Sequence, residues 1–131
     1  MAETPRFPVS VKGVVFIGNR VVLLENERAE WELPGGRLER GEDPEDCLRR
    51  EMREELSIGV EVERLLDCWR YEVLAGIEVV IVTFGCRTAD RQVALSSEHK
   101  AVGLFGVDEI AALAMPEGYR RSIREWQRLA A

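Results

Sequence analysis

Runs of apolar and β-branched residues, separated by short polar breaks, dominate the chain and predict a β-rich fold. We expect five strands, at residues 9–17, 20–24, 60–73, 77–86 and 101–105. Gly18-Asn19 separates the first two strands and is a hairpin signal. Ala75-Gly76 separates the third and fourth strands in the same way.

Two segments have helical spacing instead. Asp43 followed by Pro44 is typical of a helix start, and that helix should run to about Leu56, with Ser57 and Gly59 closing it. A last helix should begin at Pro116, since apolar residues recur on one face at Tyr119, Ile123, Trp126 and Ala130. A short helix is expected at 107–114. This order predicts an α/β fold in which helices cover both faces of a mixed sheet, and the length fits one domain over 1–131.

The charge balance limits the classes of partner. The 131 residues include 18 Lys and Arg against 24 Asp and Glu, a formal net charge of −6, which argues against long nucleic acids and anionic membranes as partners. The longest apolar run, 110–115, is too short to cross a bilayer, and the N-terminus lacks a signal-peptide pattern. Three cysteines without a CxxC pair, with His99 as the single histidine, indicate reduced thiols in a cytoplasmic protein.

The predicted helix at 44–56 carries a compact acidic face. At 100° per residue, Glu54 and Glu55 lie about 60° to one side and about 40° to the other side of Glu51. Leu48, Met52 and Leu56 form an adjoining apolar stripe that should dock on the sheet. Most charge runs are simply solvated faces, and arginines on the same helix can offset part of the repulsion. A hard divalent ion such as Mg²⁺ would offset the repulsion among the three glutamates more fully, because it binds carboxylate oxygens and leaves coordination positions for phosphates.

The spacing of these residues resembles the signature box of the Nudix hydrolases. The matching residues are Gly36, Glu42, Arg50, Glu51, Met52, Glu54, Glu55 and Ile58. Ser57 replaces the usual glycine, which puts the turn after the helix in question: either serine adopts the strained backbone or the turn moves to Gly59. The lead-in at 31–36, WELPGG, is also similar to that of family members. The resemblance implies a Nudix-like α/β/α sandwich and a metal-dependent diphosphate hydrolase.

The resemblance also implies roles for individual residues. Metal, either Mg²⁺ or Mn²⁺, would be held by Glu51, Glu54 and Glu55, with the carbonyl of Gly36 as an extra ligand. Arg50 would orient a glutamate, and Glu42 would support the loop or a further ion. Two candidates for the general base stay open, Glu51 and Glu98.

The resemblance further implies that the substrate is a small nucleotide or nucleoside diphosphate derivative, most simply a nucleoside triphosphate, with clearance of modified nucleotides as one role. Trp31, beside the glycine turn, is the first candidate for stacking on a base, followed by Phe7, Trp69 and Tyr71. Together with Arg50, Trp31 and Tyr71 are our candidate substrate-binding residues. The alternatives are ADP-ribose, dinucleoside polyphosphates, or a nucleotide-sensing module that does not catalyse; the net charge counts against RNA ends. A homodimer is left open.

Overall fold

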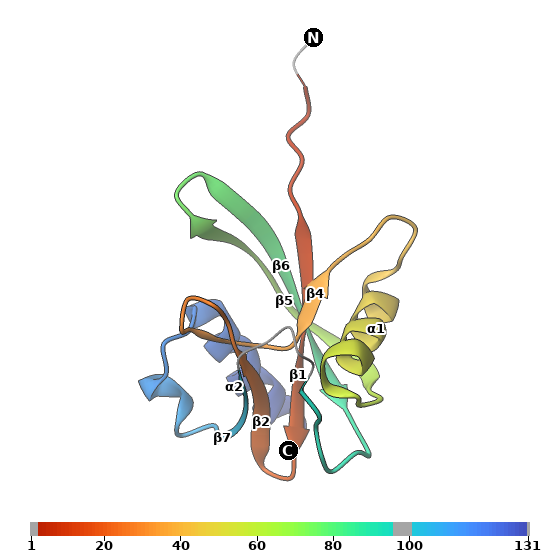
Figure 1. Cartoon of the computed structure of the whole chain (residues 1–131), viewed down its shortest axis with the longest axis vertical. Coiled ribbons are helices and arrows are strands. Elements are labelled where there is room, and N and C mark those ends of the chain that lie inside the picture. The colour runs from red at the N-terminus through yellow and green to blue at the C-terminus, as the bar shows by residue number, and fades with distance from the viewer. Residues whose placement is uncertain (1–2, 96–100, 131) are drawn as a thin grey trace.

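The computed structural model describes residues 3–95 and 101–130 and shows a β-sheet flanked by helices (Figure 1). Its elements, in chain order, are β1 Val9–Ile17, β2 Arg20–Glu25, β3 Trp31–Glu32, β4 Gly35–Arg37, α1 Pro44–Leu56, β5 Glu61–Leu74, β6 Ile77–Arg87, β7 Ala101–Gly106, the 3-10 turn η1 Ile110–Ala112 and α2 Glu117–Ala130. No helix in this described part is long and apolar enough to cross a membrane.

The sheet is mixed. Its central path runs β3-β2-β1-β6-β5, while β4 pairs with β1 and β7 pairs with β2. The pair β1–β6 is parallel, and the other pairs are antiparallel. The expected hairpins β1–β2 and β5–β6 are both present, and the second is long enough to project beyond the rest of the sheet (Figure 1).

The two α-helices cover opposite faces of this sheet. Because successive side chains of a strand point to opposite faces, Val11 and Val15 of β1 pack in the cluster that includes α1, whereas Val14 packs in the cluster that includes α2. All three valines are fully buried. A strand buried on both faces reads as the continuous apolar run seen in the sequence. The predicted α/β/α sandwich is therefore confirmed.

The close contact between α2 and the sheet explains the place of Trp126. This residue is 5% exposed, and its indole N–H donates to the backbone oxygen of Cys86 at 3.2 Å. A Cβ atom at Gly85 would lie 2.3 Å from the Trp126 ring, so only glycine allows this approach. Trp126 is a packing residue, as its helical spacing predicts.

Helix α1 begins and ends at the predicted positions, and the structure adds the geometry of its two caps. Asp43 occupies the N-cap position, but its side chain makes no capping hydrogen bond. The helix ends at Ser57, whose φ of 57° and ψ of 34° are left-handed. Gly59 has no positive φ. The turn therefore keeps its ordinary position, and serine adopts the backbone that glycine usually supplies.

The structure differs from the sequence prediction in three short segments. Strands β3 and β4 were not predicted, because two or three residues carry no detectable alternation. The helix expected at 107–114 is wrong in extent: only Ile110–Ala112 forms a 3-10 turn. All three cysteines are free, but Cys68 is exposed while Cys47 and Cys86 are buried.

Candidate active site

The acidic face of α1 lies directly beside its buried stripe. Leu48, Met52 and Leu56 are fully buried, so the rotation of the helix is fixed. The three neighbouring glutamates then differ sharply in exposure. The side chains of Glu51 and Glu54 are 17% and 59% exposed, and Glu55 as a residue is 5% exposed. The face therefore runs from the interior to the solvent over a single helical turn.

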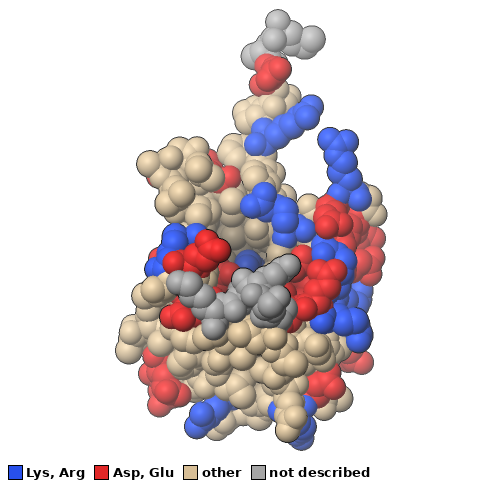
Figure 2. Space-filling model, in the orientation of Figure 1, with Lys and Arg blue, Asp and Glu red and all other residues tan. Residues whose placement is uncertain are grey.

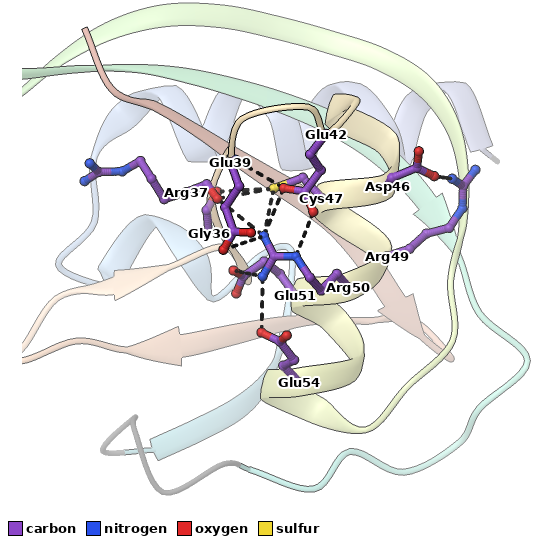
Figure 3. Close-up of polar contacts among 10 residues, drawn as sticks. All are labelled: Gly36, Arg37, Glu39, Glu42, Asp46, Cys47, Arg49, Arg50, Glu51 and Glu54. Carbon is purple, nitrogen blue, oxygen red and sulfur yellow. Dashed lines mark hydrogen bonds and ion pairs between the residues drawn. The ribbon is translucent and has the colours of Figure 1, made fainter.

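Arg50 lies at the centre of the charged network (Figure 3). Its Nε and Nη2 donate to the two carboxylate oxygens of Glu42 at 2.7 and 3.0 Å. Its Nη1 donates to Glu51 at 2.9 Å and to Glu54 at 3.3 Å. This bidentate contact needs two parallel N–H donors on a planar guanidinium, which lysine does not have. Arg50 thus fixes the loop before α1 relative to the acidic face.

Glu42 is held as a carboxylate by this arrangement. The hydrogen bonds from Arg50 are the main cause that lowers the pKa of Glu42 to about 2, and the backbone N–H of Glu39 adds to the effect at 3.2 Å. Burial acts in the opposite direction and is outweighed. Arg50 is correspondingly held in its protonated form, since the same contacts raise its pKa.

The Glu51 carboxylate packs against the backbone of Gly36. A Cβ atom at position 36 would lie 2.4 Å from the carboxyl carbon of Glu51 and 2.5 and 2.6 Å from its two oxygens. Gly36 lies in β4, opposite Val11 of β1. Because glycine has no Cβ atom, the Glu51 carboxylate can pack directly against the backbone of β4; any larger residue at position 36 would occupy the same space.

Glu55 is the buried member of the acidic face. Its Oε1 accepts a hydrogen bond from the backbone N–H of Gly35 at 2.9 Å. Burial raises the pKa of Glu55 to about 7, while Lys12 and the Gly35 N–H oppose that rise. A carboxylate in such a position gains from a nearby cation, because the cation offsets the loss of solvation.

The donor chemistry of this face suits a hard divalent ion. Glu51, Glu54 and Glu55 offer only oxygen atoms, which Mg²⁺ and Mn²⁺ accept. In the present conformation, however, no three acidic, histidine or cysteine side chains converge as a metal cage within residues 3–95 and 101–130. The carbonyl of Gly36 takes part in a weak contact with the Cys47 thiol, at 3.8 Å. Binding of a metal would therefore require side chains of the face to leave their present partners.

The candidates for substrate contact lie in two aromatic groups. The ring of Trp31 packs edge-on against Phe105, with centroids 4.8 Å apart. Tyr71 belongs to a second group, in which Trp69 lies 5.5 Å from Tyr71 and 5.4 Å from Tyr119. Phe7 is 48% exposed. Glu98, the second candidate base, lies outside the described residues, as does His99.

Lys12 and Glu32 are polar residues near this face that sequence reasoning missed. Lys12 is 8% exposed in the middle of β1, and its Nζ lies 3.8 Å from Glu32. The available signal was a single lysine within the otherwise apolar run 11–17 of a strand that is buried on both faces. Figure 2 shows acidic and basic side chains intermixed on the flank where α1 lies in Figure 1.

Comparison with known proteins agrees with the fold and the box. The family model of the NUDIX domain matches residues 6–126. The chain therefore belongs to the NUDIX domain family, and the enzyme class expected from the box, a Nudix-type diphosphate hydrolase, is confirmed.

Individual relatives and structures are similar over most of the chain. A MutT-like protein of Streptomyces ambofaciens is 35% identical over 82% of this chain and 69% of its own length. Nucleoside triphosphatase NudI of Enterobacter sp. (strain 638) is 30% identical over 70% of this chain and 72% of its own. A NUDIX-family hydrolase of Clostridium perfringens superimposes with a TM-score of 0.84 at 14% identity, covering 97% of this chain and all of the other. A UDP-X diphosphatase has a TM-score of 0.77 at 22% identity over 98% of this chain, which spans only 65% of that longer chain.

Proposed function

We propose that this chain is a Mg²⁺-dependent pyrophosphohydrolase that cleaves nucleoside triphosphates to a monophosphate and pyrophosphate. The observation that carries the proposal is the carboxylate face of α1, complete in all three glutamates and ordered by Arg50. A chain whose acidic face served only for solubility would have no need of a buried Glu55 or of a glycine fitted to Glu51. The similarity to a nucleoside triphosphatase supports the substrate class.

In this proposal the site residues have three roles: binding the metal, positioning the glutamates and accepting a proton. Glu51, Glu54 and Glu55 would hold Mg²⁺, or Mn²⁺ in its place, and the Gly36 carbonyl would be a further ligand. The bound metal would supply positive charge to the phosphate oxygens on which negative charge develops. Arg50 keeps Glu51 and Glu54 in place and ties them to Glu42. The proton of the attacking water would pass to Glu51 or Glu98.

The proposed test is a substrate panel with Mg²⁺ that contains nucleoside triphosphates, ADP-ribose, nucleotide sugars and dinucleoside polyphosphates. We expect Glu54→Gln and Glu55→Gln to lower kcat by at least a hundredfold on the preferred substrate. Glu45→Gln is the matched control, since Glu45 is an exposed acid in the first turn of the same helix. Equal, metal-independent rates for the wild type and the site variants would overturn the proposal, and tight binding of intact nucleotide would favour the sensing module instead.

We also infer a cytoplasmic protein that acts on small nucleotides, in keeping with the reduced cysteines and the negative charge. A homodimer stays a prediction, which light scattering of the purified chain would test.

A further inference from the structure

Lys12 is a buried cation whose donors are largely unused. It lies in β1, and its side chain is 9% exposed. Within the described part of the chain its one ion pair is with Glu32 at 3.8 Å, beyond hydrogen-bond distance, and its three ammonium N–H groups make no hydrogen bond there. The Nζ atom keeps some contact with solvent, since Trp69 Nε1 is the one fully buried side-chain polar atom without a partner among the described residues. An ammonium that is mostly buried and makes no protein hydrogen bond still loses much of its solvation, so its presence needs a reason.

Glu32 does not fully account for Lys12. The second oxygen of Glu32 accepts a hydrogen bond from Asn26 at 3.3 Å, and the Glu32 side chain is 19% exposed. The carboxylate is therefore shared between two partners and open to solvent. An ion pair of this kind is usually no more stable than a pair of apolar residues of similar size. Stability alone does not explain a lysine here.

The position of Lys12 connects it to the candidate active site. In the ladder between β1 and β4, Lys12 lies opposite Gly35, whose N–H holds Glu55, and the next pair is Val11 with Gly36, on which Glu51 rests. Burial alone would lower the pKa of Lys12, but Tyr119 and three acidic side chains outweigh it and raise the pKa. The cation is therefore charged at neutral pH. Its side chain leaves β1 on the same face as Val14, towards Tyr119 of α2, and the carboxylates of Glu32, Glu55 and Glu51 are near enough to act on its charge.

We propose that Lys12 is a substrate-binding residue whose ammonium donates to a non-bridging oxygen of the phosphate chain. This inference rests on the proposed function, since it places the phosphates at the carboxylate face. A phosphate oxygen supplies what the described residues do not: an anionic acceptor for the free N–H groups. Glu32 then acts as a temporary counter-ion, which keeps the charge of Lys12 balanced while the site contains no substrate.

The test measures binding rather than turnover. The probes are the α,β-methylene analogues of ATP and GTP, compared with adenosine and guanosine, by calorimetry in the presence of Mg²⁺. We expect Lys12→Met to weaken binding of the better analogue by roughly ten- to hundredfold, the loss of one hydrogen bond to a charged group, with the nucleosides unaffected. Lys12→Arg should retain part of the affinity, because it keeps the charge.

Two further variants separate binding from folding. Lys12→Met/Glu32→Gln removes both charges, so it should melt at or above the temperature of the single variant while still binding the analogue weakly. Arg20→Met, at an exposed position of β2, should bind as the wild type does. Analogue affinities of Lys12→Met within twofold of the wild type, or an equal loss for nucleoside and analogue, would overturn the proposal. Wild-type binding of the analogue without turnover of any triphosphate would instead overturn the proposed function alone.

Discussion

Replacing Gly36 with alanine should inactivate the site without unfolding the protein. The added Cβ would lie 2.4 Å from the carboxyl carbon of Glu51, whereas ordinary van der Waals contact begins near 3.4 Å. The carboxylate must therefore move by about 1 Å or more, because the strand backbone at Gly36 is fixed by its pairing with β1. The displaced group is the end of a flexible side chain, so the strain is relieved by rotation of Glu51.

The size of the effect follows from that displacement. A misplacement of about 1 Å at a reacting centre can lower the rate by about a hundredfold. Rotation of Glu51 would also disturb its 2.9 Å hydrogen bond with Arg50. We therefore expect kcat to fall by about a hundredfold and the affinity for Mn²⁺ to fall as well, with a loss of at most about 1 kcal/mol in the free energy of unfolding.

The assay combines steady-state kinetics on the preferred substrate, a Mn²⁺ titration and a thermal melt. Gly59→Ala is a matched control, since the new Cβ would meet only the end of the Arg53 side chain, at 3.4 Å, and Gly59 has no positive φ. Activity of Gly36→Ala within threefold of the wild type would refute the link between this glycine and the position of Glu51. A melting temperature lowered in proportion to the activity would point to a general loss of structure instead.

Two further predictions concern stability. Ser57→Gly should raise the free energy of unfolding by about 1 kcal/mol, measured by urea unfolding, because glycine adopts the left-handed backbone without strain; Ser57→Ala should give no gain. Glu42→Gln should be less stable than the wild type at neutral pH. The folded-state pKa of Glu42 is lowered to about 2 from 4.5, so its contribution is full above that ordinary value and is lost as the pH falls towards 2, where the two proteins should unfold alike.

The sequence predicts the long elements well because their patterns repeat several times. Strand β1 begins and ends where the apolar run does, and α1 is bounded by a proline and by the residue after Leu56. Strands β3 and β4 exist only because they pair with β2 and β1, a long-range condition that no local pattern expresses.

The candidate site was predictable in its residue types and less so in its geometry. Spacing alone brought Glu51, Glu54 and Glu55 to one face of a helix. It did not indicate that Glu55 accepts a hydrogen bond from the backbone N–H of Gly35, or that Arg50 forms a bidentate contact with Glu42. These contacts depend on how the loop before α1 folds back over the helix.

Because α1 contributes both to the core and to the acidic face, its amide protons should exchange with solvent only when the whole sheet opens. Leu48, Met52 and Leu56 would have to leave the interior before the helix could fray past its last turn. We therefore expect α1, which carries the carboxylates, to be among the slowest-exchanging parts of the chain. Adjustment to an incoming ion should then come from side-chain rotation and from the loop that carries Glu42. Slow amide exchange along α1 together with faster exchange in that loop would support a rigid helix beside a loop that adjusts to the ion.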